Sequence, residues 1–223
     1  MLYVLILTVF CAVFAGLMLY KEKIKKFIAA DIWKGLASLC FVLIGVLNNP
    51  GGNIARLLIC GLILGFIADI LLNLRFIFKD KMGQLAFLVG ILVFLAGHIV
   101  YLVAILEMST NWKLCLVIGA ILAALLLIWL FKNIKAKLPF MIFGVFYIGA
   151  IMLMNAVAVG NLIASPSAFT ALFAIGAILF LASDIVLIIN TFGKTFRESF
   201  RITNIVLYYA GQILIAVSLM FLR

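Results

Sequence analysis

The chain has 223 residues, of which 69% are hydrophobic and only 11% are charged. Water-soluble domains are about 45–50% apolar and about 25% charged, so this composition excludes a soluble globular protein and indicates an integral membrane protein. A net charge of +10 would suggest nucleic-acid binding in a soluble protein. Here the basic residues lie almost entirely between hydrophobic segments, so no nucleic-acid partner is expected.

Eight apolar stretches follow one another along the chain, and each is long enough to cross about 30 Å of hydrocarbon as a helix. They predict an all-α polytopic membrane protein with one integral membrane domain over residues 1–223. The predicted spans are 2–20, 28–47, 54–74, 83–106, 113–131, 139–160, 167–189 and 202–222. The first span lacks the basic n-region and cleavage motif of a signal peptide, so it is expected to be a membrane helix.

The distribution of positive charge predicts the orientation of the chain in the membrane. Thirteen basic residues lie in the loops after the first, third, fifth and seventh spans: Lys21, Lys23, Lys25, Lys26, Arg75, Lys79, Lys81, Lys132, Lys135, Lys137, Lys194, Arg197 and Arg201. Only Arg56, Lys113 and Arg223 lie on the other side. Because basic loops remain in the cytoplasm, both termini are expected to be extracytoplasmic. The membrane would be the bacterial cytoplasmic membrane or, in a eukaryote, the endoplasmic reticulum.

Two short motifs recur at nearly the same offset. Ala68-Asp69-Ile70 is echoed 115 residues later by Ser183-Asp184-Ile185, and Ala96-Gly97-His98-Ile99 is echoed 114 residues later by Ala210-Gly211-Gln212-Ile213. The offsets suggest that the first half of the chain, 1–110, is repeated in parallel as the second half, 111–223. Chance recurrence is the alternative, because the matched stretches are short and rich in Ala and Ile.

Two aspartates lie inside the apolar spans, Asp69 in the third and Asp184 in the seventh. An ionised carboxylate at membrane depth costs on the order of several kcal/mol, so such a residue is a candidate for function. Each lies five residues before the predicted end of its span, which places both roughly 8 Å below the cytoplasmic boundary. Lys34 enters the second span to a similar depth. Because one lysine cannot neutralise two carboxylates, at least one carboxyl is expected to be protonated at neutral pH.

Two carboxyl groups in different protonation states suit acid–base catalysis, since one can donate a proton while the other stabilises a cation or acts as a base. Such pairs cleave acetals through an oxocarbenium-like transition state. Further polar candidates at this depth are Asn73, His98, Tyr147, Tyr208, Tyr209 and Gln212. Two of the candidates have structural alternatives. His98 could serve as a buried hydrogen-bonding residue between helices, and Lys34 could extend its ammonium group to the membrane interface.

The sequence predicts no metal site and no cofactor. His98 is the only histidine, which excludes a histidine-rich zinc site, and the seven acidic residues are scattered along the chain.

An ordered set of motifs covers nearly the whole chain. It comprises Ala68-Asp69-Ile70-Leu71-Leu72, Phe87-Leu88-Val89-Gly90, Phe94, Gly97-His98, Tyr101, Ser183-Asp184-Ile185-Val186-Leu187, Tyr209 and Gln212. This set, the chain length and the number of spans resemble the YhhN-like lysoplasmalogenase family. Two positions depart from the family pattern: Ala68 stands where glycine is usual, and Lys34-Gly35 stands where Lys-Pro is typical.

The resemblance implies hydrolysis of the vinyl ether bond of a lysoplasmalogen to a fatty aldehyde and glycerophosphoethanolamine or glycerophosphocholine. The implied partners are a lysophospholipid substrate and membrane lipids. One of Asp69 and Asp184 would protonate the vinyl β-carbon, and the other would stabilise the cation and later activate water. Lys34 would tune the pair or hold the phosphate. The residues expected to orient water and the glycerol hydroxyls are His98, Tyr147, Tyr209 and Gln212.

A proton-coupled carrier of small molecules or lipids is the alternative function, because parallel repeats and membrane carboxylates also occur in transporters. Against it, proline is absent from the interiors of the second to eighth spans. An intramembrane aspartyl protease would need Gly-x-Gly-Asp, whereas Phe66-Ile67-Ala68 and Leu181-Ala182-Ser183 precede the two aspartates here.

Overall fold

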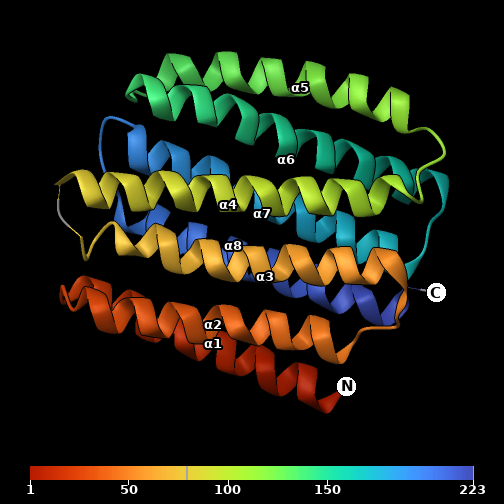
Figure 1. Cartoon of the computed structure of the whole chain (residues 1–223), viewed down its shortest axis with the longest axis horizontal. Coiled ribbons are helices and arrows are strands. Elements are labelled where there is room, and N and C mark those ends of the chain that lie inside the picture. Colours follow the sequence, from red (N-terminus) through yellow and green to blue (C-terminus); the bar gives the residue numbers. More distant parts are fainter. Residues whose placement is uncertain (79, 223) are drawn as a thin grey trace.

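The structure is a computed structural model, and it describes residues 1–78 and 80–222. Every regular element in these two ranges is helical (Figure 1). The elements are α1 (Leu2–Lys23), α2 (Phe27–Leu47), α3 (Gly52–Leu74), α4 (Asp80–Leu106), α5 (Trp112–Asn133), α6 (Leu138–Ala164), α7 (Ala168–Phe192), α8 (Glu198–Ser218) and the short 3-10 helix η1 (Leu219–Phe221). The eight α-helices are each long and apolar enough to cross a membrane, which confirms the predicted all-α polytopic class.

The helix ends differ from the predicted spans by a few residues, and one difference concerns the helix that carries Asp184. Hydropathy marks the part of a helix that lies in hydrocarbon, whereas backbone hydrogen bonding continues into the interface. α7 therefore runs to Phe192, three residues past its predicted end, and α3 ends at Leu74 as predicted. At 1.5 Å per residue Asp184 lies about 12 Å from the end of its helix and Asp69 about 8 Å. The distance to a helix end is not the depth in the membrane, so the equal depth of the two carboxyl groups stays a prediction.

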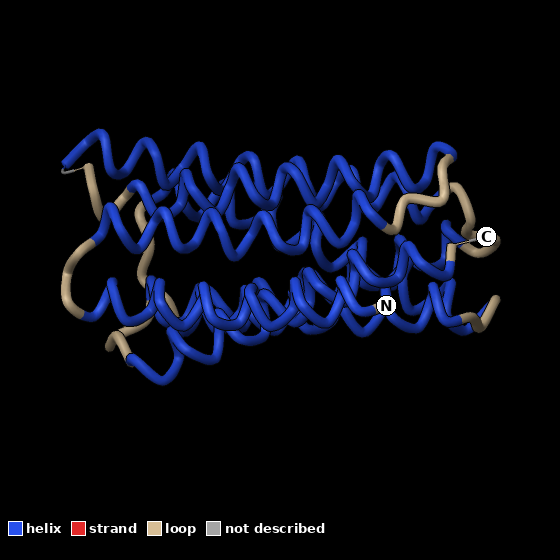
Figure 2. The backbone as a smooth tube through the Cα atoms, turned by 90° about the horizontal axis from the view of Figure 1, so that it is seen from below, coloured by secondary structure: helices blue, strands red, loops and turns tan. Residues whose placement is uncertain are grey.

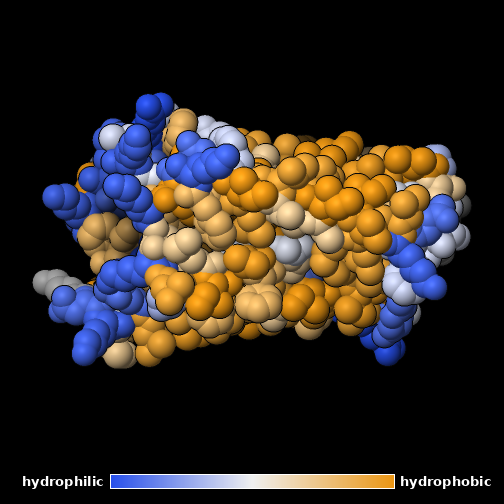
Figure 3. Space-filling model, turned by 90° about the horizontal axis from the view of Figure 1, so that it is seen from above, coloured by the Kyte–Doolittle hydropathy of each residue, from blue (hydrophilic) through white to orange (hydrophobic). Residues whose placement is uncertain are grey.

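The helices lie side by side along one long axis, and the loops gather at the two ends of the bundle (Figures 1 and 2). Both termini lie at the same end. The loops after α1, α3, α5 and α7 lie at the opposite end, which we call the basic end because it carries the lysine-rich loops. Figure 3 shows one side of the bundle, with hydrophilic residues gathered at its two ends and a broad hydrophobic belt between them. Of the charges used to predict orientation, Lys79 and Arg223 lie outside the described residues.

Paired helices approach each other at two matching glycine pairs, and the α7–α8 contact is the tighter of the two. A Cβ added at Gly211 of α8 would lie 2.8 Å from the carbonyl oxygen of Gly176 on α7. A Cβ added at Gly97 of α4 would lie 3.5 Å from the carbonyl oxygen of Gly61 on α3. Small residues commonly permit such contacts between membrane helices. The two pairs differ by 115 and 114 residues, the same offsets as the sequence motifs, and the internal duplication stays a prediction.

The central helices carry the buried polar residues. α8 packs against α7, α2, α1 and α3, whereas α1 and α5 lie at the outer edges of the bundle and bury the smallest share of their residues (Figure 1). Lys34, Asp69, His98, Asp184 and Gln212 are all buried, and they lie on α2, α3, α4, α7 and α8. The bundle therefore gathers its polar groups around an interior region that the outer helices shield from lipid.

Candidate active site

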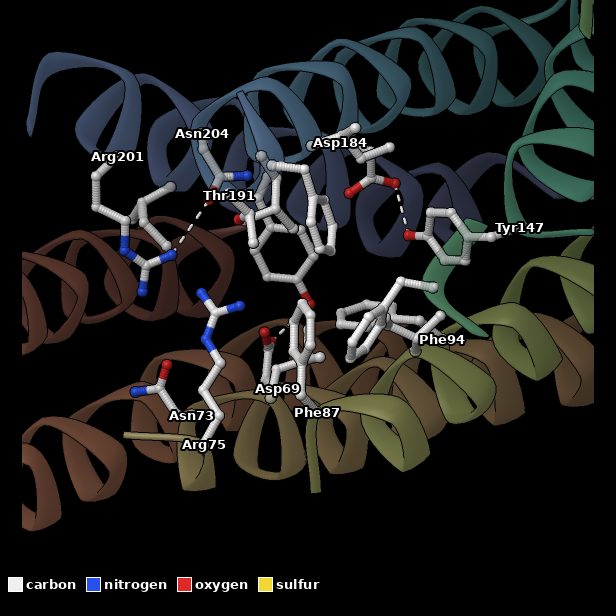
Figure 4. A pocket seen from close by; sticks show the side chains of 18 of the residues that line it. Asp69, Asn73, Arg75, Phe87, Phe94, Tyr147, Asp184, Thr191, Arg201 and Asn204 are labelled. Carbon is white, nitrogen blue, oxygen red and sulfur yellow. Dashed lines mark hydrogen bonds between the residues drawn. The ribbon is translucent and has the colours of Figure 1, made fainter. Parts of the chain in front are cut away.

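A pocket with both membrane aspartates in its wall lies between the central helices. Its volume is about 90 Å³, which is enough for several water molecules. The lining comes from α2, α3, α4, α6, α7 and α8 and is mostly apolar, with Phe87, Phe94 and Phe140 among its residues. Figure 4 shows Asp69 and Asp184 approaching the same space from opposite walls. Two carboxyl groups from separate spans are thus brought to one cavity.

The Asp69 carboxyl group is held by three donors. The ammonium Nζ of Lys34 lies 3.1 Å from Oδ1. The hydroxyl groups of Ser38 and Tyr208 each donate a hydrogen bond of 2.6 Å to Oδ2. All four side chains are buried. A cation and two hydroxyl donors are what an ionised carboxylate needs when water is removed, so this arrangement suits a fixed negative charge at Asp69.

Tyr209 supports this cluster from behind. Its hydroxyl group lies 3.2 Å from Oγ of Ser38 and donates to the backbone carbonyl oxygen of Lys34 at 3.3 Å. It makes no hydrogen bond to Asp69 among the described contacts. Tyr209 therefore positions the residues that bind the carboxylate.

The Asp184 carboxyl group has different surroundings. The Tyr147 hydroxyl group donates a hydrogen bond of 2.6 Å to Oδ2, and Nε2 of His98 lies 3.1 Å from the same hydroxyl oxygen (Figure 4 shows the Tyr147 bond). His98 itself is 3.8 Å from Asp184 Oδ2, too far for a hydrogen bond. Since the Tyr147 hydrogen is used for Asp184, the network assigns the donated hydrogen to Nε2 of His98.

Two atoms at this end of the site are left without hydrogen bonds to the described residues. Nδ1 of His98 is buried without a partner, which fits a bare lone pair in the tautomer that carries hydrogen on Nε2. Oδ1 of Asp184 also has no protein partner, and Figure 4 shows the carboxyl group at the pocket wall. Asp184 thus keeps one oxygen available to a ligand.

The candidates predicted from sequence divide into two groups. Those that line the pocket are Lys34, Asp69, Asn73, Tyr147, Asp184 and Tyr208. His98, Tyr209 and Gln212 lie behind the wall and contact the residues that line it. Gln212 accepts a hydrogen bond from Tyr101 at 3.1 Å and donates one to the Tyr208 hydroxyl at 3.4 Å. These three residues orient protein groups in this structure, whereas sequence analysis expected them to orient water and glycerol hydroxyls.

The sequence patterns did not single out Ser38, which is a direct ligand of Asp69, or the two arginines of the pocket. Ser38 lies one helical turn after Lys34, so their shared face was a usable signal. Tyr208 was noted only for its depth. Arg75 and Arg201 were counted as loop charges, yet both line the pocket. Hydropathy places them at the interface, and only the packing of the bundle turns them inward.

Over residues 1–78 and 80–222, no three His, Cys, Asp or Glu side chains gather closely enough to share a metal ion. The polar groups of the pocket are instead a lysine, two arginines, two carboxyls, amides and hydroxyls. This set suits proton transfer and the binding of an anion.

Comparison with known proteins identified one related family. The model of the YhhN family matches residues 29–219, a range that contains all the residues that line the pocket and all the ligands of both aspartates. Neither the comparison with curated proteins nor the comparison with solved structures found a match.

Proposed function

Because the chain belongs to the YhhN family, we propose that it is a membrane hydrolase that cleaves the vinyl ether bond of lysoplasmalogens. The products are a fatty aldehyde and glycerophosphoethanolamine or glycerophosphocholine. One observation carries the proposal: two carboxyl groups with unlike partners line one largely apolar pocket. Asp69 has a cation and two hydroxyl donors, whereas Asp184 has one hydroxyl donor and one free oxygen.

The unlike partners assign the two roles. Asp184 is the general acid and transfers its proton from Oδ1 to the β-carbon of the vinyl ether, while Tyr147 holds Oδ2 in place. Protonation forms a C–H bond and moves the π electrons, which leaves an oxocarbenium ion at the carbon attached to oxygen. Asp69 remains ionised and stabilises that cation electrostatically. His98 orients Tyr147 and so acts through it.

Water then completes the reaction. It adds to the oxocarbenium carbon and gives up a proton to the Asp184 carboxylate, which restores the starting protonation state. The resulting hemiacetal collapses as its carbon–oxygen bond to glycerol breaks, and the hydroxyl proton passes to the glycerol oxygen. One water molecule is consumed for each aldehyde formed. The apolar walls suit the vinyl ether group, and the volume of about 90 Å³ is enough for the attacking water.

The direct test uses purified protein in detergent with a 1-alkenyl lysophospholipid, and aldehyde release is followed by coupled reduction with NADH. We expect aldehyde from the wild type and none from the saturated 1-alkyl ether, which cannot form the oxocarbenium ion by protonation. Asp184→Asn and Asp69→Asn are each expected to lower kcat by about 10²–10⁴-fold while the protein remains folded. Thermal unfolding and size-exclusion profiles check the folding.

Two outcomes would contradict the proposal. Near-normal turnover in either Asn variant would rule out the paired-carboxylate mechanism. Binding of the alkenyl lipid without any aldehyde release would favour a carrier, which is tested by movement of the lipid across vesicles. By the positive-inside rule we propose that the basic end faces the cytoplasm, so that the pocket receives lipid from that leaflet.

A further inference from the structure

Arg75 lies where the active-site pocket meets a second pocket. The second pocket has a volume of about 420 Å³ and lies toward the basic end. It is lined by residues of α1, α2, α7, α8, the turn after α3 and the loop before α8. Four residues line both pockets: Arg75, Leu187, Thr191 and Arg201. A ligand that extends from the aspartates toward the basic end therefore passes the two arginines.

The guanidinium group of Arg75 lies against two aromatic rings. Its Cζ lies 4.4 Å from the centre of the Phe87 ring and 4.6 Å from the centre of the Phe76 ring. Nε is buried and has no hydrogen-bond partner. In the described part of the chain, no carboxylate lies within salt-bridge distance of Arg75. The rings orient the group but do not neutralise its charge.

The other two cations of the active-site pocket are already paired. Lys34 contacts Asp69 at 3.1 Å. Arg201 donates two hydrogen bonds to Glu22, of 2.6 Å from Nη2 and 3.1 Å from Nε. Arg75 thus adds a positive charge that has no salt-bridge partner among the described residues. Arg75 is half-buried, and a partly desolvated charge without a partner is costly, so a ligand that supplies the negative charge binds favourably.

The charge of Arg75 and the groups around it favour an anionic ligand. Burial and the nearby charge of Arg201 lower the pKa of Arg75 to about 10, although the Glu22 carboxylate acts in the opposite direction, so the group is still cationic at neutral pH. Figure 4 shows the guanidinium groups of Arg75 and Arg201 turned toward the same space, with Asn73 beside Arg75. Asn73 and Thr191 also line the pocket and offer amide and hydroxyl donors. Together these groups form a cradle for tetrahedral oxygens.

We propose that Arg75 is the principal binding residue for the phosphodiester of a single-chain phospholipid, with Arg201 as a secondary contact. The proposal rests on the proposed function, and it sets the direction in which the substrate lies. Arg75 follows Asp69 by six residues, a rise of about 9 Å along α3 toward the basic end. That separation is comparable with an extended glycerol phosphate. A phosphate at Arg75 therefore places the sn-1 vinyl ether beside the aspartates and the headgroup in the outer pocket.

The test measures binding without cleavage. The ligand is 1-O-hexadecyl-glycero-3-phosphocholine, a saturated ether that cannot react, and its partner is 1-O-hexadecylglycerol, which lacks the phosphate. Affinities are measured by calorimetry on protein in nanodiscs. Arg75→Gln is expected to weaken binding of the phosphocholine lipid by about 10- to 100-fold and to leave hexadecylglycerol binding unchanged. Arg75→Lys keeps the charge and loses the forked geometry. Its affinity for the phosphocholine lipid should lie between those of the wild type and Arg75→Gln.

The matched control is Arg56→Gln, which removes an exposed arginine from the opposite end of α3. It should bind both ligands as the wild type does. Unchanged hexadecylglycerol binding also shows that Arg75→Gln is folded. Equal weakening of both ligands, or of neither, would overturn the assignment. Wild-type binding of inorganic phosphate as tight as that of the lipid, and lost in Arg75→Gln, would overturn the lipid assignment in favour of free phosphate.

The two proposals can fail separately. If the protein binds the phosphocholine lipid through Arg75 but releases no aldehyde from the alkenyl lipid, the proposed function is contradicted and the phosphate site is supported. If aldehyde is released with the same KM by Arg75→Gln and by the wild type, the proposed function is supported and the phosphate site is contradicted.

Discussion

The ammonium group of Lys34 lies 3.1 Å from Oδ1 of Asp69, and the side chains of both residues are only 5% and 3% exposed. This ion pair joins α2 to α3 inside the bundle, beside the pocket. Two opposite charges at this depth are tolerated because each compensates the other, and the hydroxyl groups of Ser38 and Tyr208 satisfy the remaining carboxylate oxygen.

The first prediction concerns this pair. Lys34→Met leaves the Asp69 carboxyl group buried without its cation, and we expect the free energy of unfolding to fall by about 3–5 kcal/mol. The double variant Lys34→Met/Asp69→Leu removes both charges and should recover most of that stability while remaining inactive. Thermal unfolding in detergent measures the cycle. A single Lys34→Met variant as stable as the wild type would show that the pair carries no such role.

The second prediction compares two adjacent tyrosines. The Tyr208 hydroxyl group donates directly to Asp69, whereas the Tyr209 hydroxyl group contacts Ser38 and the Lys34 carbonyl oxygen. Tyr208→Phe keeps the ring but removes a donor from the carboxylate, so we expect kcat for aldehyde release to fall by about tenfold or more. Tyr209→Phe is the matched control and should have a smaller effect. Equal effects would contradict the assigned contacts.

The third prediction concerns the hydrogen-bonded chain from His98 through Tyr147 to Asp184. Tyr147→Phe breaks both of its bonds, so the Asp184 carboxyl group loses its fixed orientation. We expect kcat to fall by about tenfold or more, with the affinity for the saturated ether lipid unchanged. Tyr3→Phe removes a hydroxyl group at the end of the bundle that carries the termini and should keep wild-type turnover. Normal kcat in Tyr147→Phe would remove Tyr147 from the mechanism.

The fourth prediction concerns helix packing. A Cβ at Gly211 would meet the carbonyl oxygen of Gly176 at 2.8 Å and the backbone nitrogen of Phe180 at 3.0 Å, and backbone atoms cannot move aside cheaply. Gly211→Ala is therefore expected to lower the free energy of unfolding by about 1–3 kcal/mol, as overpacking does. At Gly149 nothing lies within 4 Å, so Gly149→Ala should be neutral or slightly stabilising. Scanning fluorimetry distinguishes the two, and an unaffected Gly211→Ala would contradict the close α7–α8 contact.

Sequence by itself determined the class of the molecule and the residues at its centre. Runs of about 20 apolar residues specify membrane helices wherever they occur, because the backbone must satisfy its own hydrogen bonds in hydrocarbon. The same local logic singled out Asp69 and Asp184, since a carboxyl group within such a run needs compensation that only a buried site provides. These inferences need no knowledge of how the helices are arranged.

Tertiary structure alone decided which groups meet each carboxyl. Adjacent helical residues point about 100° apart, so the rotation of α8 determines that Tyr208, and not Tyr209, reaches Asp69. The packing of α2 against α3 places Lys34 beside Asp69, whereas Asp184 has Tyr147 as its hydrogen-bond partner. Arg75 and Arg201, which read as loop charges along the chain, turn into the pocket through the same packing. Hydropathy does not indicate how a helix is rotated about its axis or at what angle two helices cross. Both depend on how side chains fit together between segments far apart in sequence.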